Sequence, residues 1–146
     1  MSDDDSDETR PTTDETGWMT DQPTAPRPPA DPDAHALALS CAAAAEDEHG
    51  RDVIVLDVGD LISIAEYFVI VSGHNRRLVA TLAEKIEERA KAELTRSPRR
   101  IEGAEHQQWV LLDYGDVVVH VFLDEVREFY DIERLYRDVP VLRRSD

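Results

Sequence analysis

One stretch of this 146-residue chain, residues 109–122, constrains the fold more than any other. Two runs rich in valine, leucine and aromatic residues flank Gly115 and Asp116. A glycine at the first of two central positions suits a type II′ turn, which joins adjacent antiparallel strands. The sequence therefore predicts a β-hairpin with a two-residue loop, in a register that places Trp109 opposite Phe122.

The predicted hairpin has one largely apolar face and one mixed face, because side chains along a strand alternate between its two sides. The apolar face, which we expect to join the core, carries Val110, Leu112, Tyr114, Val117, Val119 and Val121. The mixed face carries Trp109, Leu111, Asp113, Val118, His120 and Phe122. Aromatic side chains concentrate the energy of protein interfaces, so the mixed face is a candidate binding surface. The alternative is that helices cover this face too and Trp109 is ordinary core.

The rest of the folded part alternates between helical and strand patterns. Helices are expected over residues 34–49, 75–94, 125–130 and 132–136, and further strands over residues 52–58, 67–72 and 99–102. Asn75 is a good N-cap for the second helix. Helices mixed with strands in this order predict an α/β fold with a mixed β-sheet and flanking helices.

Residues 1–33 differ in composition from the remainder. They hold six of the eight prolines and ten acidic residues against two basic ones. Such a segment buries too little apolar surface to offset the entropy of ordering. We therefore expect a disordered, acidic, proline-rich tail over 1–33, an α/β domain over 34–139 and a frayed C-terminus over 140–146.

The net charge of −16 narrows the choice of partners. Outside residues 1–33 the chain has 22 acidic residues against 14 basic ones, so the folded part is itself negative. Proteins that bind DNA or bare RNA through its phosphates use lysine and arginine for these contacts. The excess of acidic residues therefore argues against binding of nucleic acid through its phosphates. The charge favours a basic protein partner reached by electrostatic steering. The alternative is that acidity only aids solubility or reflects a salt-rich habitat.

Cysteine usage and hydropathy indicate the compartment. Cys41 is the only cysteine, so neither an intrachain disulfide nor a cysteine-based zinc site is expected. The N-terminus lacks the basic start and apolar stretch of a signal peptide. No apolar run is long enough to span a bilayer. We expect a cytoplasmic protein with no membrane contact.

Little in the sequence indicates an enzyme. The histidines show no metal-ligand spacing, and no nucleophile, base and acid form a set, so no cofactor or metal is expected. Ser72 and Gly73 precede a helix whose N-terminus could seat a phosphate, although an ordinary strand-to-helix turn explains them as well. Two aspartate pairs bracket glycine-containing turns, where aspartate commonly bonds locally; they are Asp57 with Asp60 and Asp113 with Asp116. A nucleotide-binding enzyme of nucleotidyltransferase type is the alternative that these features leave open.

Several stretches match one known family in order and spacing. They are residues 57–58, 67–73, 77–80, 102–103, 109–122 and 127–136. The most specific are the runs Gly-Asp-Val-Val-Val-His-Val-Phe and Phe-Tyr-Asp-Ile-Glu-Arg-Leu. Over about residues 36–139 the chain thereby resembles the ribosomal silencing factor family, also called the Iojap family. It departs from the family pattern at Val71, usually a cysteine, over residues 74–78, and at Tyr136, usually a tryptophan.

The resemblance implies a nucleotidyltransferase-like fold without the catalytic motif, and a role that is not enzymatic. It implies a factor that binds the fourteenth protein of the large ribosomal subunit, blocks joining of the small subunit and represses translation when nutrients are short. Organellar relatives act in ribosome biogenesis, and members are often homodimers when free. The contacts carried over from the family's hairpin surface are Trp109, Leu111, Asp113, Tyr114, Asp116, His120 and Phe122. Whether Tyr114, at the hairpin tip, faces the core or the partner stays open.

Overall fold

The computed structural model describes residues 32–62 and 64–145 of the chain. In order, they form α1 (Pro32–Asp47), β1 (Arg51–Asp57), β2 (Tyr67–Gly73), α2 (Arg76–Leu94), β3 (Arg100–Glu102), β4 (Trp109–Asp113), β5 (Val117–Leu123), α3 (Asp124–Tyr130), the 3-10 helix η2 (Ile132–Tyr136) and β6 (Val141–Arg144). The expectation for the tail lies almost wholly outside the described residues. Its boundary is two residues too late, because α1 begins at Pro32.

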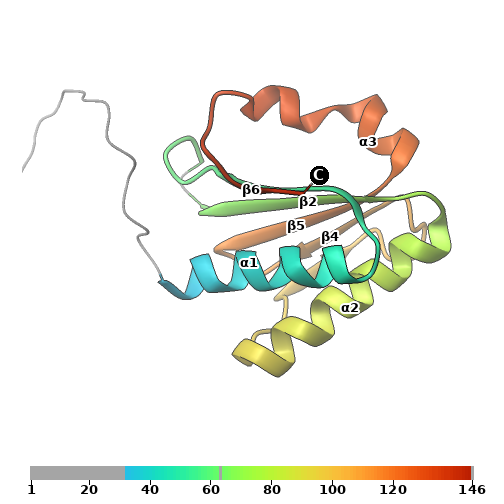
Figure 1. Cartoon of the computed structure of the whole chain (residues 1–146), viewed down its shortest axis with the longest axis horizontal. Coiled ribbons are helices and arrows are strands. Elements are labelled where there is room, and N and C mark those ends of the chain that lie inside the picture. The colour runs from blue at the N-terminus through green and yellow to red at the C-terminus, as the bar shows by residue number, and fades with distance from the viewer. Residues whose placement is uncertain (1–31, 63, 146) are drawn as a thin grey trace, which may run out of the picture. The chain divides into compact units, whose positions relative to one another are not determined.

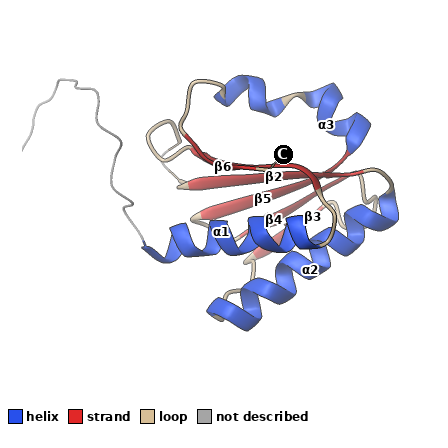
Figure 2. Cartoon of the chain, viewed as in Figure 1, coloured by secondary structure: helices blue, strands red, loops and turns tan. Residues whose placement is uncertain are grey.

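The six strands form a single mixed sheet in the order β3-β4-β5-β2-β1-β6 (Figure 2). The central pair, β2 and β5, is parallel, and every other neighbouring pair is antiparallel. All seven residues of β2 are buried, as expected for a strand covered on both faces. The prediction of an α/β fold with a mixed sheet and flanking helices is confirmed.

Helices cover both faces of the sheet. Figure 1 shows α1 and α2 on one side and α3 with η2 on the other. The apolar stripe of α2 (Val79, Leu82, Ala83, Ile86 and Ala90) is buried in the larger of two core clusters. The start of this helix is as predicted, because Oδ1 of Asn75 accepts the Leu78 N–H at 2.7 Å. No helix formed by the described residues has the length and apolarity needed to cross a bilayer.

The hairpin has the predicted register. Trp109 pairs with Phe122, and the Tyr114 N–H donates to the Val117 carbonyl at 2.9 Å. Gly115 has a φ of +93°, a conformation that a residue with a side chain rarely adopts. The six residues of the apolar face are all buried in the cluster beneath α1 and α2. That face is core, as the alternation of side chains predicted.

The prediction of a frayed C-terminus is wrong for residues 141–145. β6 pairs antiparallel with β1, and the Ser145 N–H donates to the Val53 carbonyl at 2.8 Å. Arg143 adds an ion pair with Glu46 of α1. The physical reason is that β1 is largely buried and its outer edge needs hydrogen-bond partners. A four-residue strand ending in two arginines carries too little pattern to reveal this pairing.

Candidate protein-binding surface

The mixed face of the hairpin lies on the side of the sheet that carries α3 and η2, because Trp109 and Phe122 share a core cluster with Val126 of α3 and with Ile132 and Tyr136 of η2. Phe122 is fully buried there, in a second core cluster that also includes Phe68 and Ile70 of β2. Trp109 and Val118 are only partly buried against the same cluster. The helices therefore cover part of the mixed face and leave the β4 side of it accessible.

Trp109 lies at the boundary between the covered and the accessible parts. Its ring packs against Phe122 of β5 at a centroid distance of 4.8 Å and against Tyr130 of α3 at 5.1 Å. Its indole Nε1–H donates to Nδ1 of His120 at 3.1 Å. Trp109 thus joins the hairpin to α3 while part of its surface stays exposed.

His120 is buried within an aromatic environment. Its ring lies 4.8 Å from the Phe68 ring, edge to face, and stacks on Phe122 at 6.1 Å. Burial lowers the pKa of His120 to about 4, so its imidazole is neutral near pH 7. Its Nε2 is buried and has no hydrogen-bond partner. The structure gives His120 no surface on which a partner could make the polar contact that the resemblance implied.

The two aspartates at the hairpin tip are engaged within the chain. The buried Asp113 carboxylate accepts from Arg100 at 3.2 Å and from the Gly115 N–H at 2.8 Å, and Arg99 lies 3.5 Å from it. Asp116 accepts from Arg96 at 2.7 Å. Both charges are balanced locally, so a basic partner would have to displace an arginine to reach either one.

Tyr114 points into the core. It is buried among the residues beneath α1 and α2, and burial raises the pKa of its hydroxyl well above the usual range. The hydroxyl oxygen has no hydrogen-bond partner. The carried-over role of Tyr114 as a partner contact therefore conflicts with its burial. Among the seven residues named from the sequence, only Trp109, Leu111 and Asp116 keep partial exposure.

The most exposed large apolar side chains near Trp109 are on α3, and sequence reasoning missed them as contacts. Phe129 is 80% exposed and Tyr130 is 55% exposed, and their rings are 5.0 Å apart. Together with Trp109 and the partly buried Leu111, they form what we call the aromatic surface. The sequence signal that could have indicated this exposure is the pair of adjacent aromatic residues, Phe129 and Tyr130, in a short helix. Adjacent residues point in different directions around a helix, so a short helix does not readily bury both.

Arg127 links α3 to β1, β2 and η2 by hydrogen bonds. Its guanidinium makes a bidentate pair with Glu133 of η2, at 2.7 and 3.1 Å, and donates to Oγ of Ser72 at 2.8 Å and to the Arg51 carbonyl at 3.4 Å. α3 has no fully buried residue of its own. The orientation of the aromatic residues on α3 therefore depends on this polar contact, on the partly buried Val126 and on the packing of Tyr130 against Trp109.

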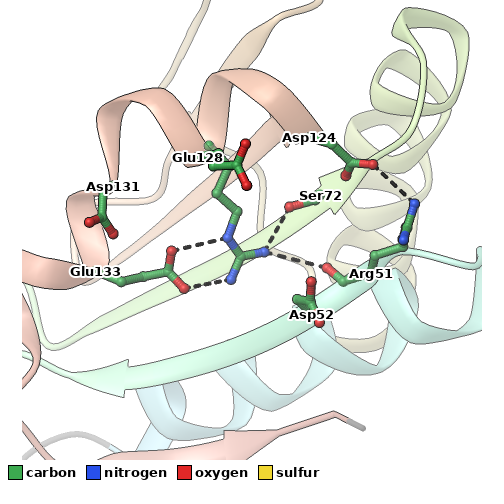
Figure 3. Close-up of a pocket in the computed structure, with 8 residues that line it drawn as sticks. Arg51, Asp52, Ser72, Asp124, Glu128, Asp131 and Glu133 are labelled. Atoms are coloured by element: carbon green, nitrogen blue, oxygen red, sulfur yellow. Dashed lines mark hydrogen bonds and ion pairs between the residues drawn. The ribbon is translucent and has the colours of Figure 1, made fainter.

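The Arg127 guanidinium borders an open cavity of about 510 Å³ at the end of β2. Figure 3 shows carboxylates around it, and its lining includes five of them: Asp52, Asp124, Glu128, Asp131 and Glu133. In the described part of the chain, no three acidic, histidine or cysteine side chains are arranged to hold a metal ion.

The residues that favoured a nucleotide-binding alternative have internal roles. Ser72 is buried and accepts from Arg127, and the N-terminus of α2 is capped by Asn75. Asp57 and Asp113 each accept the N–H of the glycine two residues on, at 3.2 and 2.8 Å. This is the local bonding that aspartate makes in turns.

The fold and the aromatic surface define an α/β domain with a candidate protein-binding face. A family model described as "Ribosomal silencing factor during starvation" matches residues 31–146. The chain is 37% identical over 100 residues to the ribosomal silencing factor RsfS of Bacillus subtilis, covering 68% of this chain and 84% of that protein. It is 33% identical over 91 residues to mouse "Mitochondrial assembly of ribosomal large subunit protein 1", covering 61% of this chain and 40% of that protein.

Solved structures agree with these matches. A crystal structure of a Chromobacterium violaceum protein superposes with a TM-score of 0.67 at 37% identity, covering 70% of this chain and 84% of that one. The chain belongs to the ribosomal silencing factor family. The resemblance noted from the sequence motifs is thereby confirmed.

Proposed function

We propose that this protein binds the large ribosomal subunit through its fourteenth protein, prevents joining of the small subunit and so represses translation under nutrient limitation. Family membership supports the ribosomal role, because the matching family is described as silencing ribosomes during starvation. A mouse relative is named for assembly of the large subunit. These names also support a role that is not enzymatic.

The observation that carries the proposal is the aromatic surface. Two aromatic side chains more than half exposed are costly in water, and burying them against a partner recovers roughly 25 cal/mol per Å² of apolar area. Trp109 and Tyr130 already pack together, so they would enter a complex with little further ordering. We therefore assign the main contacts to Trp109, Leu111, Phe129 and Tyr130.

The charge around the aromatic surface selects the kind of partner. Residues 124–136, which span α3, η2 and the residue between them, carry five carboxylates. Two of them form ion pairs, Glu133 with Arg127 and Asp124 with Arg51. The exposed Glu125, Glu128 and Asp131 leave this side of the domain negative. An apolar centre with an acidic rim is complementary to a basic protein surface, and ribosomal proteins are of this kind.

Co-sedimentation with purified large subunits tests the proposal. Trp109→Ala and Phe129→Ala should each weaken binding, with roughly 2 kcal/mol lost at an interface hot spot. Leu142→Ala is the matched control, because Leu142 is a partly exposed apolar residue on β6, four strands away from β4 in the sheet. Wild-type affinity in both test variants would refute the assignment of the surface.

The consequence for subunit joining needs its own measurement. Adding the protein to separated subunits should reduce the amount of assembled ribosomes on a sucrose gradient, and the two test variants should reduce it less. Unchanged joining at protein concentrations that saturate the large subunit would contradict the anti-association role while leaving binding intact.

The homodimer that the family resemblance implies stays a prediction. Phe129 and Tyr130 are among the exposed apolar residues that could also serve self-association. Light scattering across a concentration series measures the mass of the free protein. If Phe129→Ala converts a dimer to a monomer, self-association and ribosome binding share one surface.

A further inference from the structure

The hydrogen bond between Trp109 and His120 uses the only polar group of the Trp109 side chain. The indole Nε1–H is a donor and has no acceptor counterpart. It lies 3.1 Å from Nδ1 of His120, on the neighbouring strand. Trp109 is paired with Phe122, two residues beyond His120, so the indole reaches diagonally across the hairpin. Trp109 therefore has no donor left for a partner.

This hydrogen bond selects one orientation of the indole. The packing of Trp109 against Phe122 and Tyr130 is apolar and tilted, with interplanar angles of 34° and 47°, so it does not specify where the indole nitrogen points. A hydrogen bond is directional and weakens steeply when its angle departs from linear. The bond to His120 thus fixes the direction of the indole nitrogen, which ring packing alone does not.

His120 is itself rigidly held. It is 6% exposed, with Phe68 against one edge and Phe122 stacked on it. Because Nδ1 accepts from Trp109, the neutral ring carries its proton on Nε2. That Nε2 is buried without a partner, so no polar contact competes to turn the imidazole away from Trp109.

We propose that His120 is a positioning residue, which holds the Trp109 indole in its docking orientation so that Trp109 presents a partner with an apolar ring and no donor. This inference rests on the proposed function, since it concerns the same aromatic surface. It assigns the partner an apolar pocket for Trp109, without a carboxylate or carbonyl aimed at the indole nitrogen.

Two substitutions at His120 distinguish its role as hydrogen-bond acceptor for the Trp109 indole from its role as a packed side chain. In His120→Asn, the side-chain oxygen occupies the position of Nδ1 and still accepts. In His120→Leu, a side chain of similar bulk has no acceptor. Affinity for large subunits is measured by co-sedimentation. Hydrogen exchange of the Trp109 indole is followed by nitrogen-15 NMR of the free protein, with Trp18 as the second indole signal.

We expect His120→Leu to weaken binding roughly three- to tenfold, the range for one net hydrogen bond, and to speed exchange of the Trp109 indole. His120→Asn should stay within about twofold of wild type in both measurements if the acceptor alone is restored. Equal weakening by both variants would show that ring packing matters and would overturn the inference. Wild-type affinity in both would overturn it as well, while leaving the proposed function standing.

A measurement on the wild-type protein serves if His120→Leu does not fold. In a complex with the isolated fourteenth ribosomal protein, the Trp109 indole should remain protected from exchange, because its bond to His120 persists. Loss of protection on binding would show that the indole turns to the partner and would overturn the inference. Failure of wild type to bind either the subunit or the isolated protein would refute the proposed function and the inference together.

Discussion

Replacing Arg127 by methionine tests how α3 is held against the sheet. Methionine keeps an aliphatic stem of similar length and removes the guanidinium. The substitution deletes the bidentate pair with Glu133 and the hydrogen bonds to the Ser72 hydroxyl and the Arg51 carbonyl. α3 has no fully buried residue, so the partly buried Val126 and the packing of Tyr130 on Trp109 are the contacts left to hold it.

The exposed fractions of the Arg127 and Glu133 side chains determine how large a loss in the free energy of unfolding we expect. The Arg127 side chain is 11% exposed, which places its charge near the buried regime, where removing one partner costs roughly 3–5 kcal/mol. Glu133 is 30% exposed, so its carboxylate regains water when the guanidinium is gone. We therefore expect a loss of about 2–3 kcal/mol in the free energy of unfolding, below the fully buried range.

Urea denaturation of wild type, Arg127→Met, Glu133→Gln and the double variant measures this loss and the coupling between the two side chains. The control is Arg51→Met, which breaks the ion pair of Arg51 with Asp124 beside the same cavity. Those side chains are 60% and 36% exposed, so the control should cost less than about 1 kcal/mol.

Two results would refute the reasoning. One is a loss for Arg127→Met no larger than that for Arg51→Met, which would mean that burial of the guanidinium adds nothing. The other is a coupling energy near zero between Arg127 and Glu133. A folded Arg127→Met variant should also bind large subunits more weakly, because Phe129 and Tyr130 lose their fixed orientation.

Three further predictions concern pH, capping and the C-terminal strand. Burial holds the pKa of His120 near 4 against 6.5 for the unperturbed group. The unfolded chain therefore takes up a proton first as the pH falls from 6.5 to 4, and the free energy of unfolding should decrease by up to roughly 3 kcal/mol over that window. Urea denaturation at a series of pH values should show this decrease for wild type and not for His120→Asn. If the free energy of unfolding of the two proteins falls in parallel with pH, the prediction is contradicted. Asn75→Ala removes the cap on the Leu78 N–H and should cost about 1 kcal/mol in urea denaturation, with Asn75→Ser as the rescuing control. Deleting residues 141–146 uncovers the edge of β1, so the amides of β1 should exchange faster while those of the hairpin stay protected; uniform exchange rates would show that β6 adds no local stability.

The hairpin was predictable from the sequence because its determinants are local. A glycine with positive φ at the turn and side chains of period two define both the register and the apolar face. The same holds for α2, whose cap and stripe lie within one segment. Features set by distant pairing were missed. β6 joins β1 across about ninety residues, and Arg127 reaches Ser72 across 55 positions.

The candidate site was predicted only in part for a related reason. The alternation of side chains along the strands identifies which residues share the mixed face, and Trp109 and Leu111 are partly exposed on that face. It does not tell how much of the face a neighbouring helix covers. α3 is seven residues long, and beside the polar contact of Arg127 its Val126 and Tyr130 pack against the sheet, which is too short a pattern to indicate where the helix lies. The sequence left open whether helices cover this face, and the burial of Phe122 and His120 decides that part of it is covered.

The placement of these residues changes what the family motif means for binding. Most of residues 115–122, the run that carries the resemblance in the hairpin, are buried or paired within the domain. Substitutions at Tyr114 or Phe122, which are both buried, would therefore perturb the fold before they revealed a contact. Phe129 is exposed and touches only Tyr130 among the aromatic rings of the described residues. Its truncation should remove the proposed partner contact at little cost to stability, so Phe129→Ala should discriminate between loss of binding and loss of fold more sharply than any hairpin substitution.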